Sequence, residues 1–253
     1  MSKIAIIYFS GVCNTKYVAS LIFNSLKSIH NVEIFSIEKL PCDFDLNTYE
    51  RVVIGFPTIH SAPVKPIMEF ISHLLPCKNK IPIFIFTTCG LYSTNTLRIF
   101  AVKCYEKNLI PVMNKSYRCA ATDGILLAPF VNMWFYHEKG LVERVNRDSL
   151  YFTSLNTYKL NIPRIKLYGI INYPNKWLGQ HLRFKIYLHN DKCIKCGRCI
   201  KNCPTKAYQK NHQDYPICNT SKCLNCYRCI HHCPQLALSL SKRKTPQKTL
   251  FIH

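Results

Sequence analysis

Residues 3–19 read KIAIIYFSGVCNTKYVA and join two segments of different periodicity. The apolar, β-branched run at 3–9 predicts a buried strand, and the apolar residues of 16–29 return at helical spacing. A loop between a strand and a helix N-terminus turns backbone N–H groups and the positive end of the helix dipole toward an anion. This stretch therefore predicts a phosphate-binding turn at the start of an α/β domain.

The side chains of this turn narrow the kind of phosphate. Ser10, Asn14 and Thr15 add donors, but Lys16 stands where the nucleoside triphosphate motif G-x-x-x-x-G-K-[ST] needs its second glycine. The dinucleotide motif G-x-G-x-x-G is not met either. Hydroxyls and amides without a cation suit a single phosphate monoester.

The next hundred residues alternate between strand-like and helix-like segments. Strands are predicted at 31–37, 51–57, 81–88 and from 108, and helices at 64–75 and 94–107. This alternation predicts a doubly wound parallel sheet of five strands with helices on both faces. Such sheets bind ligands at the carboxyl ends of their strands, here residues 10–15, 56–63 and 88–95.

Composition places the chain in a reducing compartment. The sequence holds fifteen cysteines among 253 residues, and its first residues fit a buried strand better than a signal peptide. Clustered cysteines without a secretory signal indicate metal or redox chemistry rather than disulfides. No apolar run reaches the eighteen or so residues that span a bilayer, so we expect a cytoplasmic protein without a transmembrane segment.

The charge is uneven along the chain. The net charge is +21, and residues 149–253 contain only two acids, Asp191 and Asp214. A basic C-terminal part favours an acidic protein partner, with nucleic acid or an anionic membrane surface as weaker alternatives.

One internal repeat dominates the C-terminal part. CIKCGRCIKNCP at 193–204 returns as CLNCYRCIHHCP at 223–234, thirty residues later. In the spacing C-x2-C-x2-C-x3-C-P, three thiolates bind one [4Fe–4S] cluster and the fourth reaches the other cluster. The predicted ligand sets are Cys193, Cys196, Cys199 and Cys233 for one cluster, and Cys223, Cys226, Cys229 and Cys203 for the second.

Two four-cysteine zinc sites are the alternative to clusters, but such sites seldom repeat this spacing with Cys-Pro at the end. Residues 188–240 resemble a bacterial-type ferredoxin with two clusters, which implies two pseudo-symmetric halves. Cys218 lies outside both runs, and we expect it to be a small packing residue.

Residues 1–155 resemble flavodoxin, whose FMN-phosphate loop has the pattern strand, Ser/Thr-x-x-small-x-Thr, helix. The resemblance implies that the phosphate of FMN is wrapped by Ser10, Gly11, Val12, Cys13, Asn14 and Thr15. Cys13 departs from the pattern because glycine is common there. The two further flavin loops implied by the resemblance contain Pro57, Thr58, Ile59 and His60, and Thr88, Cys89, Gly90 and Tyr92.

Two of these residues have a plainer alternative. Tyr92 is either a ring that stacks on the flavin or an exposed loop tyrosine. His60 either carries a proton near the flavin or is a solvated loop histidine.

Together the two halves resemble the flavodoxin–ferredoxin fusion proteins of anaerobic bacteria and archaea. The predicted parts are a flavodoxin-like domain at 1–155, a basic aromatic connecting segment at 156–187, and a small α+β ferredoxin domain with a basic tail at 188–253. The resemblance implies a low-potential electron relay between two [4Fe–4S] clusters and FMN, with an acidic ferredoxin or flavodoxin as partner. The alternative is an FMN-dependent reductase that passes electrons from its own clusters to a small organic acceptor such as a quinone.

Overall fold

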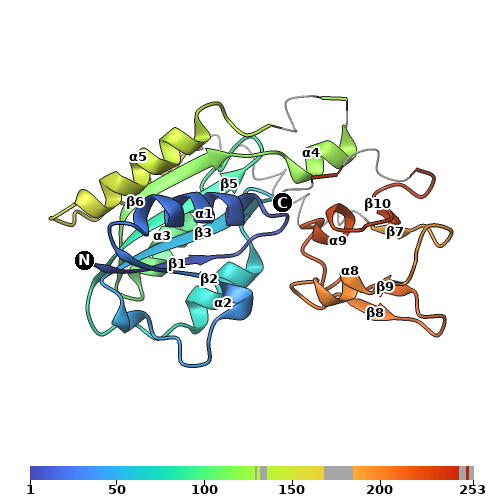
Figure 1. The fold of residues 1–253 in the computed structure, drawn as a ribbon, viewed down its shortest axis with the longest axis horizontal. Helices are drawn as coiled ribbons and strands as arrows, with labels where there is room; N and C mark the ends of the chain where they lie inside the picture. The colour runs from blue at the N-terminus through green and yellow to red at the C-terminus, as the bar shows by residue number, and fades with distance from the viewer. Residues whose placement is uncertain (129, 132–135, 168–184, 245–248, 251–253) are drawn as a thin grey trace.

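The computed structural model describes residues 1–128, 130–131, 136–167, 185–244 and 249–250. Its N-terminal part is a parallel sheet and its C-terminal part is a smaller unit beside the carboxyl ends of the strands (Figure 1). The strands of the parallel sheet are β1 (Lys3–Tyr8), β2 (Asn31–Ser36), β3 (Arg51–Ile59), β5 (Ile81–Cys89) and β6 (Leu109–Arg118).

The strand order is β2-β1-β3-β5-β6, and every neighbouring pair is parallel. The two-residue β4 (Ala62–Pro63) adds an antiparallel hairpin to the end of β3. Counted over the parallel strands alone, the order is 2-1-3-4-5, which is the flavodoxin-like arrangement. The predicted five-stranded, doubly wound sheet is therefore confirmed.

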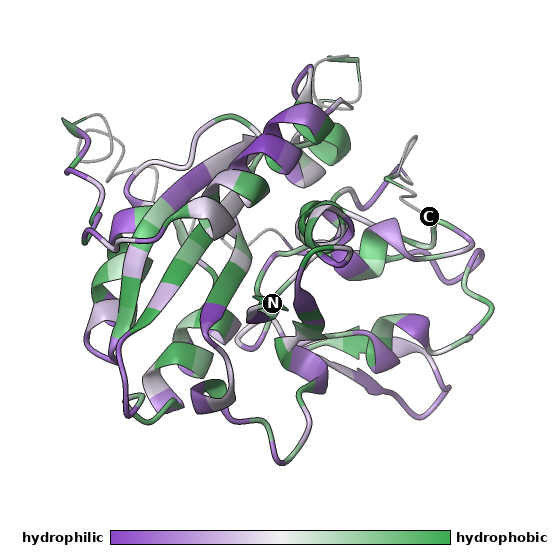
Figure 2. Cartoon of the chain, turned by 60° about the vertical axis from the view of Figure 1, so that its left-hand side comes forward, coloured by the Kyte–Doolittle hydropathy of each residue, from purple (hydrophilic) through white to green (hydrophobic). Residues whose placement is uncertain are grey.

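Helices cover both faces of the sheet and bury two apolar cores. One core lies under α1 (Asn14–Leu26) and α5 (Leu141–Ser154), and the other under α2 (Lys65–His73) and α3 (Thr96–Tyr105). Figure 2 shows hydrophobic stretches along the strands between these layers, as expected for strands that are buried on both sides. Two short 3-10 helices, η1 (Ile37–Lys39) and η2 (Leu46–Thr48), connect β2 to β3.

Two positions show how local sequence shapes the sheet. A Cβ built on Gly55 of β3 would lie 2.0 Å from the ring of Phe86, so only glycine allows this ring to cross the strand. Pro111 stands in β6, which is an edge strand, and the register shifts just beyond it between Ile83 and Phe84 of the neighbouring strand. Edge strands and bulges are where proline is tolerated in a sheet.

The observed elements agree with the predicted ones to within about three residues at each end where a segment was assigned. The sequence analysis assigned no element to α4 (Thr122–Leu127) or α5, and both follow β6 in the chain. After α5, residues near 161–166 lie along the sheet edge. The Asn161 N–H donates to the carbonyl of Pro111 at 2.7 Å, and Arg98 Nη1 donates to the carbonyl of Pro163 at 2.8 Å.

The C-terminal part consists of two similar halves. Two short antiparallel sheets pair β7 (Tyr187–Leu188) with β10 (Leu238–Ser239) and β8 (Tyr208–Lys210) with β9 (Pro216–Cys218). The helical turns α8 (Arg198–Lys201) and α9 (Arg228–His231) each begin inside a cysteine run. This arrangement is the pseudo-symmetry expected from the thirty-residue repeat.

The two parts touch through buried groups. Leu126 of α4 packs against the C-terminal core, and the fully buried His231 of α9 shares a 3.0 Å hydrogen bond with the carbonyl of Thr122. The other ring nitrogen of His231 accepts the N–H of Leu250 at 3.0 Å. The C-terminal part is thus fixed to the loop and helix that follow β6.

Part of the predicted connecting segment, including Tyr173, Trp177 and Arg183, lies outside the described residues. The boundaries at 155 and 187 stay predictions. Among the helices that the structure describes, none has the length and apolarity needed to cross a membrane.

Candidate functional site

A cavity at the carboxyl ends of the strands collects most of the predicted flavin residues. It is lined by Ser10, Gly11, Val12, Asn14, Thr15, Pro57, Thr58, Ile59, His60, Thr88, Cys89 and Gly90. We call it the loop cavity. Two predicted residues are not part of its wall: Cys13, and Tyr92, which is 68% exposed.

The first loop joins β1 to α1 and is held in a shape that leaves donors available. Cys13 precedes the helix with a φ of 66°, a conformation that favours glycine, which explains why glycine is common at this place in the flavodoxin pattern. The backbone amides of Gly11, Val12 and Cys13 donate to no acceptor within the described part of the chain. The Ser10 hydroxyl accepts the Lys16 N–H at 3.2 Å and keeps its own proton to donate.

Threonine pairs join the three loops beneath the cavity. The hydroxyls of Thr15 and Thr88 lie 2.8 Å apart, and those of Thr58 and Thr87 lie 2.9 Å apart. Asn14 Nδ2 donates to the carbonyl of Ala120 at 2.7 Å. The first loop is therefore tied to the third loop and to the segment after β6.

The second loop makes a tight hairpin between β3 and β4. Its two central residues, His60 and Ser61, both have positive φ values of 49° and 59°, as in the primed turns that suit twisted strands. Burial lowers the pKa of His60, and the nearby Asp123 carboxylate opposes this shift. His60 is consequently a neutral imidazole at pH 7.

The residues of the loop cavity fit FMN. Two buried polar atoms of its lining residues, Asn14 Oδ1 and His60 Nε2, have no hydrogen-bond partner in the part of the chain that the structure describes. Their positions suit hydrogen bonds to a polar ligand, and the open amides of the first loop suit a phosphate. Asp123 is the one charged residue among the described residues of the lining, so a phosphate there would be held by amides and hydroxyls.

The first cluster's predicted ligands surround a second cavity. Cys193, Cys196, Cys199 and Cys233 all line it, although Cys233 comes from the other half of the repeat. We call these four residues the outer cysteine set. Burial raises the pKa of Cys199 to about 11, and the thiolates of Cys233 and Cys193 add to the rise because they are close.

The other four predicted ligands also lie near one another. Burial raises the pKa of Cys226 to about 11, and the thiolates of Cys223 and Cys203 contribute because of their proximity. We call Cys203, Cys223, Cys226 and Cys229 the inner cysteine set. Each set thus includes a fourth cysteine from the opposite half of the repeat.

The two sets of cysteines do not form a compact single-ion site. Among the described residues, no group of three or more Cys, His, Asp or Glu side chains is placed to hold a single metal ion.

The inner cysteine set touches the loop cavity directly. Asn225, Cys226 and Tyr227 form part of the cavity wall, together with Ala120, Ala121, Thr122 and Asp123. A Cβ built on Gly11 would lie 3.4 Å from Cys226 Cβ, so the loop after β1 and the second cysteine run approach each other closely here. A flavin in this cavity and a cluster on the inner set would be neighbours.

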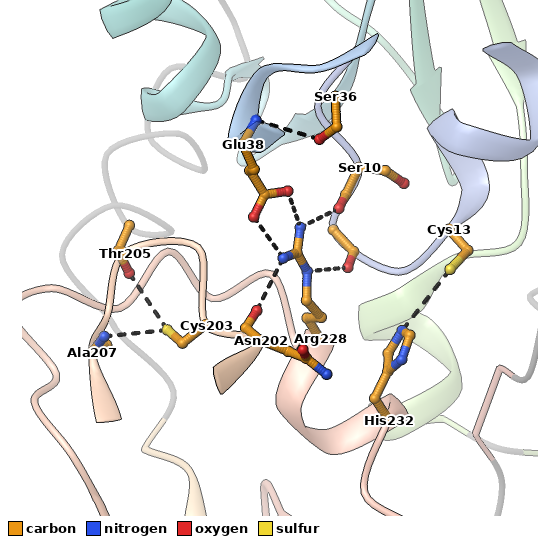
Figure 3. A network of polar contacts seen from close by, with 11 residues as sticks. Ser10, Cys13, Ser36, Glu38, Asn202, Cys203, Thr205, Ala207, Arg228 and His232 are labelled. Carbon is orange, nitrogen blue, oxygen red and sulfur yellow. Dashed lines mark hydrogen bonds and ion pairs between the residues drawn. The ribbon is translucent and has the colours of Figure 1, made fainter. Parts of the chain in front are cut away.

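Arg228 locks the two loops together (Figure 3). Its Nε donates to the Gly11 carbonyl at 2.9 Å, and its Nη2 donates to the Ser10 carbonyl at 2.5 Å. Two further donors form a bidentate pair with the carboxylate of Glu38 at 2.7 and 2.8 Å, and a fifth bond of 2.9 Å reaches the Asn202 carbonyl. On the same face, Cys13 Sγ lies 4.0 Å from His232 Nε2.

Sequence reasoning missed the residues that complete the cavity. Tyr227 could have been noticed in the sequence, because it stands where the first cysteine run has Gly197. Both residues have a left-handed backbone, with a φ of 56° at Tyr227 and 70° at Gly197. A tyrosine in this conformation is strained, and such strain concentrates at functional positions. Arg228 carried no signal, since Arg198 occupies the equivalent place in the first run.

Comparison with known proteins supports the C-terminal assignment. Residues 185–234 match the family described as the 4Fe-4S dicluster domain. Pyruvate synthase subunit PorD of Methanothermobacter marburgensis is 44% identical over 41 residues, which are 16% of this chain and 51% of that protein. The chain therefore spans about half the length of this curated relative.

Solved flavodoxins resemble the N-terminal part. Oxidised flavodoxin 1 from Bacillus cereus is 15% identical with a TM-score of 0.46, and covers 62% of this chain and 100% of its own length. A flavodoxin from the domain Archaea is 18% identical with a TM-score of 0.45, and covers 59% and 95%. The fold assignment itself rests on the strand order described above.

Proposed function

We propose that this chain, which joins a flavodoxin-like parallel sheet to a 4Fe-4S dicluster domain, transfers electrons between two [4Fe–4S] clusters and FMN. In this role it would be a low-potential redox relay of anaerobic metabolism. FMN, when bound, would supply a centre that takes one or two electrons, whereas each cluster carries one. The chain's own part is to hold these groups at fixed positions.

The observation that carries the proposal is the shared wall of the loop cavity. Cys226 is a predicted cluster ligand and lines the same cavity as Ser10, Asn14 and Thr15. A fixed, short separation between redox groups is what a relay requires, and the close approach of Gly11 to Cys226 in the cavity wall supports such a separation. The five hydrogen bonds of Arg228 keep that separation constant.

The proposed roles of the loop residues follow from their contacts. The amides of residues 11–13 and the Ser10 hydroxyl would bind the phosphate, while Thr15 is braced by Thr88. The neutral His60 would place its unpartnered ring nitrogen at a polar edge of the ligand. These residues bind and orient, and no acid–base pair for hydrolysis is formed by them.

The outer cysteine set is the proposed entry point for a partner protein. Cys196 is exposed, and Lys195, Arg198 and Lys201 lie beside it in the chain. Basic groups around an exposed redox site favour encounters with an acidic protein. The similarity to a pyruvate synthase subunit supports a redox protein as the partner, and an acidic ferredoxin or flavodoxin has the required charge.

The test is to purify the chain without oxygen and to quantify its iron and acid-released flavin. We expect about eight irons and one FMN per chain. The variant Thr15→Val should lose FMN and keep its iron, because it removes a hydroxyl that braces the phosphate loop. Thr153→Val, on the far helix α5, is the matched control and should keep both.

Eight irons without flavin in the wild-type chain would contradict the proposal. The loop cavity would then hold another ligand, and the chain would be a ferredoxin attached to a flavodoxin-like scaffold. About two zinc ions per chain, with little iron, would instead contradict the cluster assignment.

A further inference from the structure

The two halves of the C-terminal part differ at one pair of equivalent positions. In the first sheet Leu188 lies opposite Leu238, and in the second Tyr208 lies opposite Cys218. The thirty-residue repeat makes Leu188 equivalent to Cys218 and Leu238 equivalent to Tyr208. The leucine pair lines the cavity of the outer cysteine set. The tyrosine–cysteine pair takes the same place beside the inner set.

Polar side chains reach three of the four inner sulfurs. The Tyr208 hydroxyl donates to Cys229 Sγ at 3.4 Å, and the Thr205 hydroxyl lies 3.7 Å from Cys203 Sγ. The thiol of Cys218 is hydrogen-bonded to that of Cys223. When the cysteines bind iron as thiolates, their sulfurs can only accept, so all three neighbours become donors.

The outer sulfurs have no such partners. Within the described residues, no side-chain hydroxyl, thiol or amide is hydrogen-bonded to Cys193, Cys196, Cys199 or Cys233. One pair of backbone bonds matches between the two halves, since the N–H of Ala207 reaches Cys203 Sγ and the N–H of Ala237 reaches Cys233 Sγ, each at 3.2 Å. The inner set has in addition the N–H of Asn225, which donates to Cys223 Sγ at 3.4 Å. The side-chain donors and this backbone donor therefore act on the inner set in the same sense.

We infer that Tyr208, Thr205 and Cys218 raise the reduction potential of the cluster on the inner set above that of the cluster on the outer set. Donors to sulfur stabilise the reduced, more negative form of a cluster. This inference rests on the proposed function, and it gives the relay a direction. The site next to the loop cavity is the more easily reduced one.

Solvent acts in the opposite sense, because water also stabilises a more negative cluster. The two sets differ in exposure at Cys196, which is exposed, whereas the other seven ligand cysteines are of intermediate exposure. The donors act on three inner sulfurs from within hydrogen-bonding distance, so their effect prevails. The neighbouring arginines do not alter this order, because Arg198 and Arg228 occupy equivalent positions and Arg228 is already paired with Glu38.

The experiment is a potentiometric titration of the anaerobic holoprotein with dithionite, followed by electron paramagnetic resonance. Each cluster takes up one electron from the titrant. We expect two components in the wild-type chain, and Tyr208→Phe should move only the higher one downward. A threefold loss in its reduction equilibrium constant corresponds to about 28 mV, at 59 mV per tenfold change for a one-electron couple.

Two further variants make the test specific. Thr205 is half-buried and valine is nearly isosteric with threonine, so the Thr205→Val variant should fold. It should shift the same component in the same direction as Tyr208→Phe. Leu238→Met, at the position equivalent to Tyr208, should leave both components in place. The inference is overturned if Tyr208→Phe and Thr205→Val leave both potentials unchanged, or if the component that they shift is the lower one.

Flavin is quantified on the same samples. Absence of FMN would overturn the proposed relay but leave the two cluster potentials measurable. Unshifted potentials in a chain that contains FMN would overturn the inference alone.

Discussion

Arg228 is the residue on which the contact between the two parts depends. Its guanidinium uses all five N–H donors, on the carbonyls of Ser10, Gly11 and Asn202 and on both carboxylate oxygens of Glu38. Its side chain is only 13% exposed, and Glu38 compensates the buried charge. A planar fork of five donors cannot be copied by the ammonium of lysine.

We expect Arg228→Lys to weaken FMN binding about 10- to 100-fold, because hydrogen bonds to a charged group contribute roughly 1.5–3 kcal/mol. The variant would lose hydrogen bonds between the second cysteine run and the carbonyls of Ser10 and Gly11, while the cysteines stay in place. Fluorescence titration of the flavin-depleted chain with FMN measures the change. Arg198→Lys, at the equivalent position of the outer run, is the control and should alter the affinity less than twofold.

His60 gives the flavin-free chain a defined pH dependence. Burial holds the pKa of His60 below 6.5, so the unfolded chain takes up a proton in a range where the folded chain does not. The contribution of neutral His60 is complete above pH 6.5 and is lost as the pH falls below it. In His60→Gln the free energy of unfolding should fall less steeply between pH 7 and pH 5 than in the wild-type chain. Parallel slopes in chemical denaturation at several pH values would show that His60 takes up its proton over the same pH range in the folded and unfolded chains.

At the scale of elements, β3 is the strand that tolerates least change. It lies at the centre of the sheet, and Phe86 of β5 crosses it at Gly55. Three ring atoms of Phe86 would lie within 2.6 Å of an added Cβ, and this ring is fully buried. The ring therefore has no space into which it could turn.

Gly55→Ala should destabilise the N-terminal part by roughly 1–3 kcal/mol, the usual result of overpacking a core. The smaller side chain in the double variant Gly55→Ala with Phe86→Leu should remove the clash. The double variant should then be less destabilised than the sum of the single variants. Thermal unfolding of the three variants tests this coupling, and simple additivity would contradict it.

The elements that the sequence predicted well are those with a simple pattern. β1, β3 and β5 are apolar runs buried on both faces, and α1 shows its buried residues at helical spacing. Helix α5 also has buried residues at helical spacing, such as Val145 and Phe152, but its apolar stripe is interrupted because the buried Asp148 stands where the pattern calls for an apolar residue. Asp148 is compensated by Lys115 and by the Tyr117 hydroxyl of β6, partners that no local pattern reveals.

At the scale of the whole molecule, the cysteine repeat and the phosphate loop could each be predicted from the sequence, but the contact between them could not. Gly11 and Arg228 are 217 residues apart, and neither segment contains a mark of the other. The same holds for Asn225 and Tyr227, which complete the loop cavity from the far end of the chain. Contacts between such distant residues depend on how two folded surfaces fit together. No local sequence pattern reveals that fit.

The charge of the whole molecule leads to a prediction about encounter rates. With a net charge of +21, the chain should receive electrons from an acidic donor protein more slowly as salt is added. We expect the second-order rate to fall at least tenfold between 20 and 300 mM ionic strength, as is usual for steered association. Stopped-flow absorption at the cluster and flavin bands measures this rate. A neutral small-molecule reductant serves as the control, and an equal salt response with both donors would exclude steering.

The position of residues 225–227 also fixes an order of biosynthesis. These residues leave the ribosome long after the phosphate loop at 10–15, and they form the last wall of the loop cavity. A nascent chain that has completed only its parallel sheet therefore presents an open cleft. In the proposed relay the flavin would be enclosed only after residues 225–227 have folded against this cleft, so the last part of the chain to be synthesised would complete the binding site begun by the first.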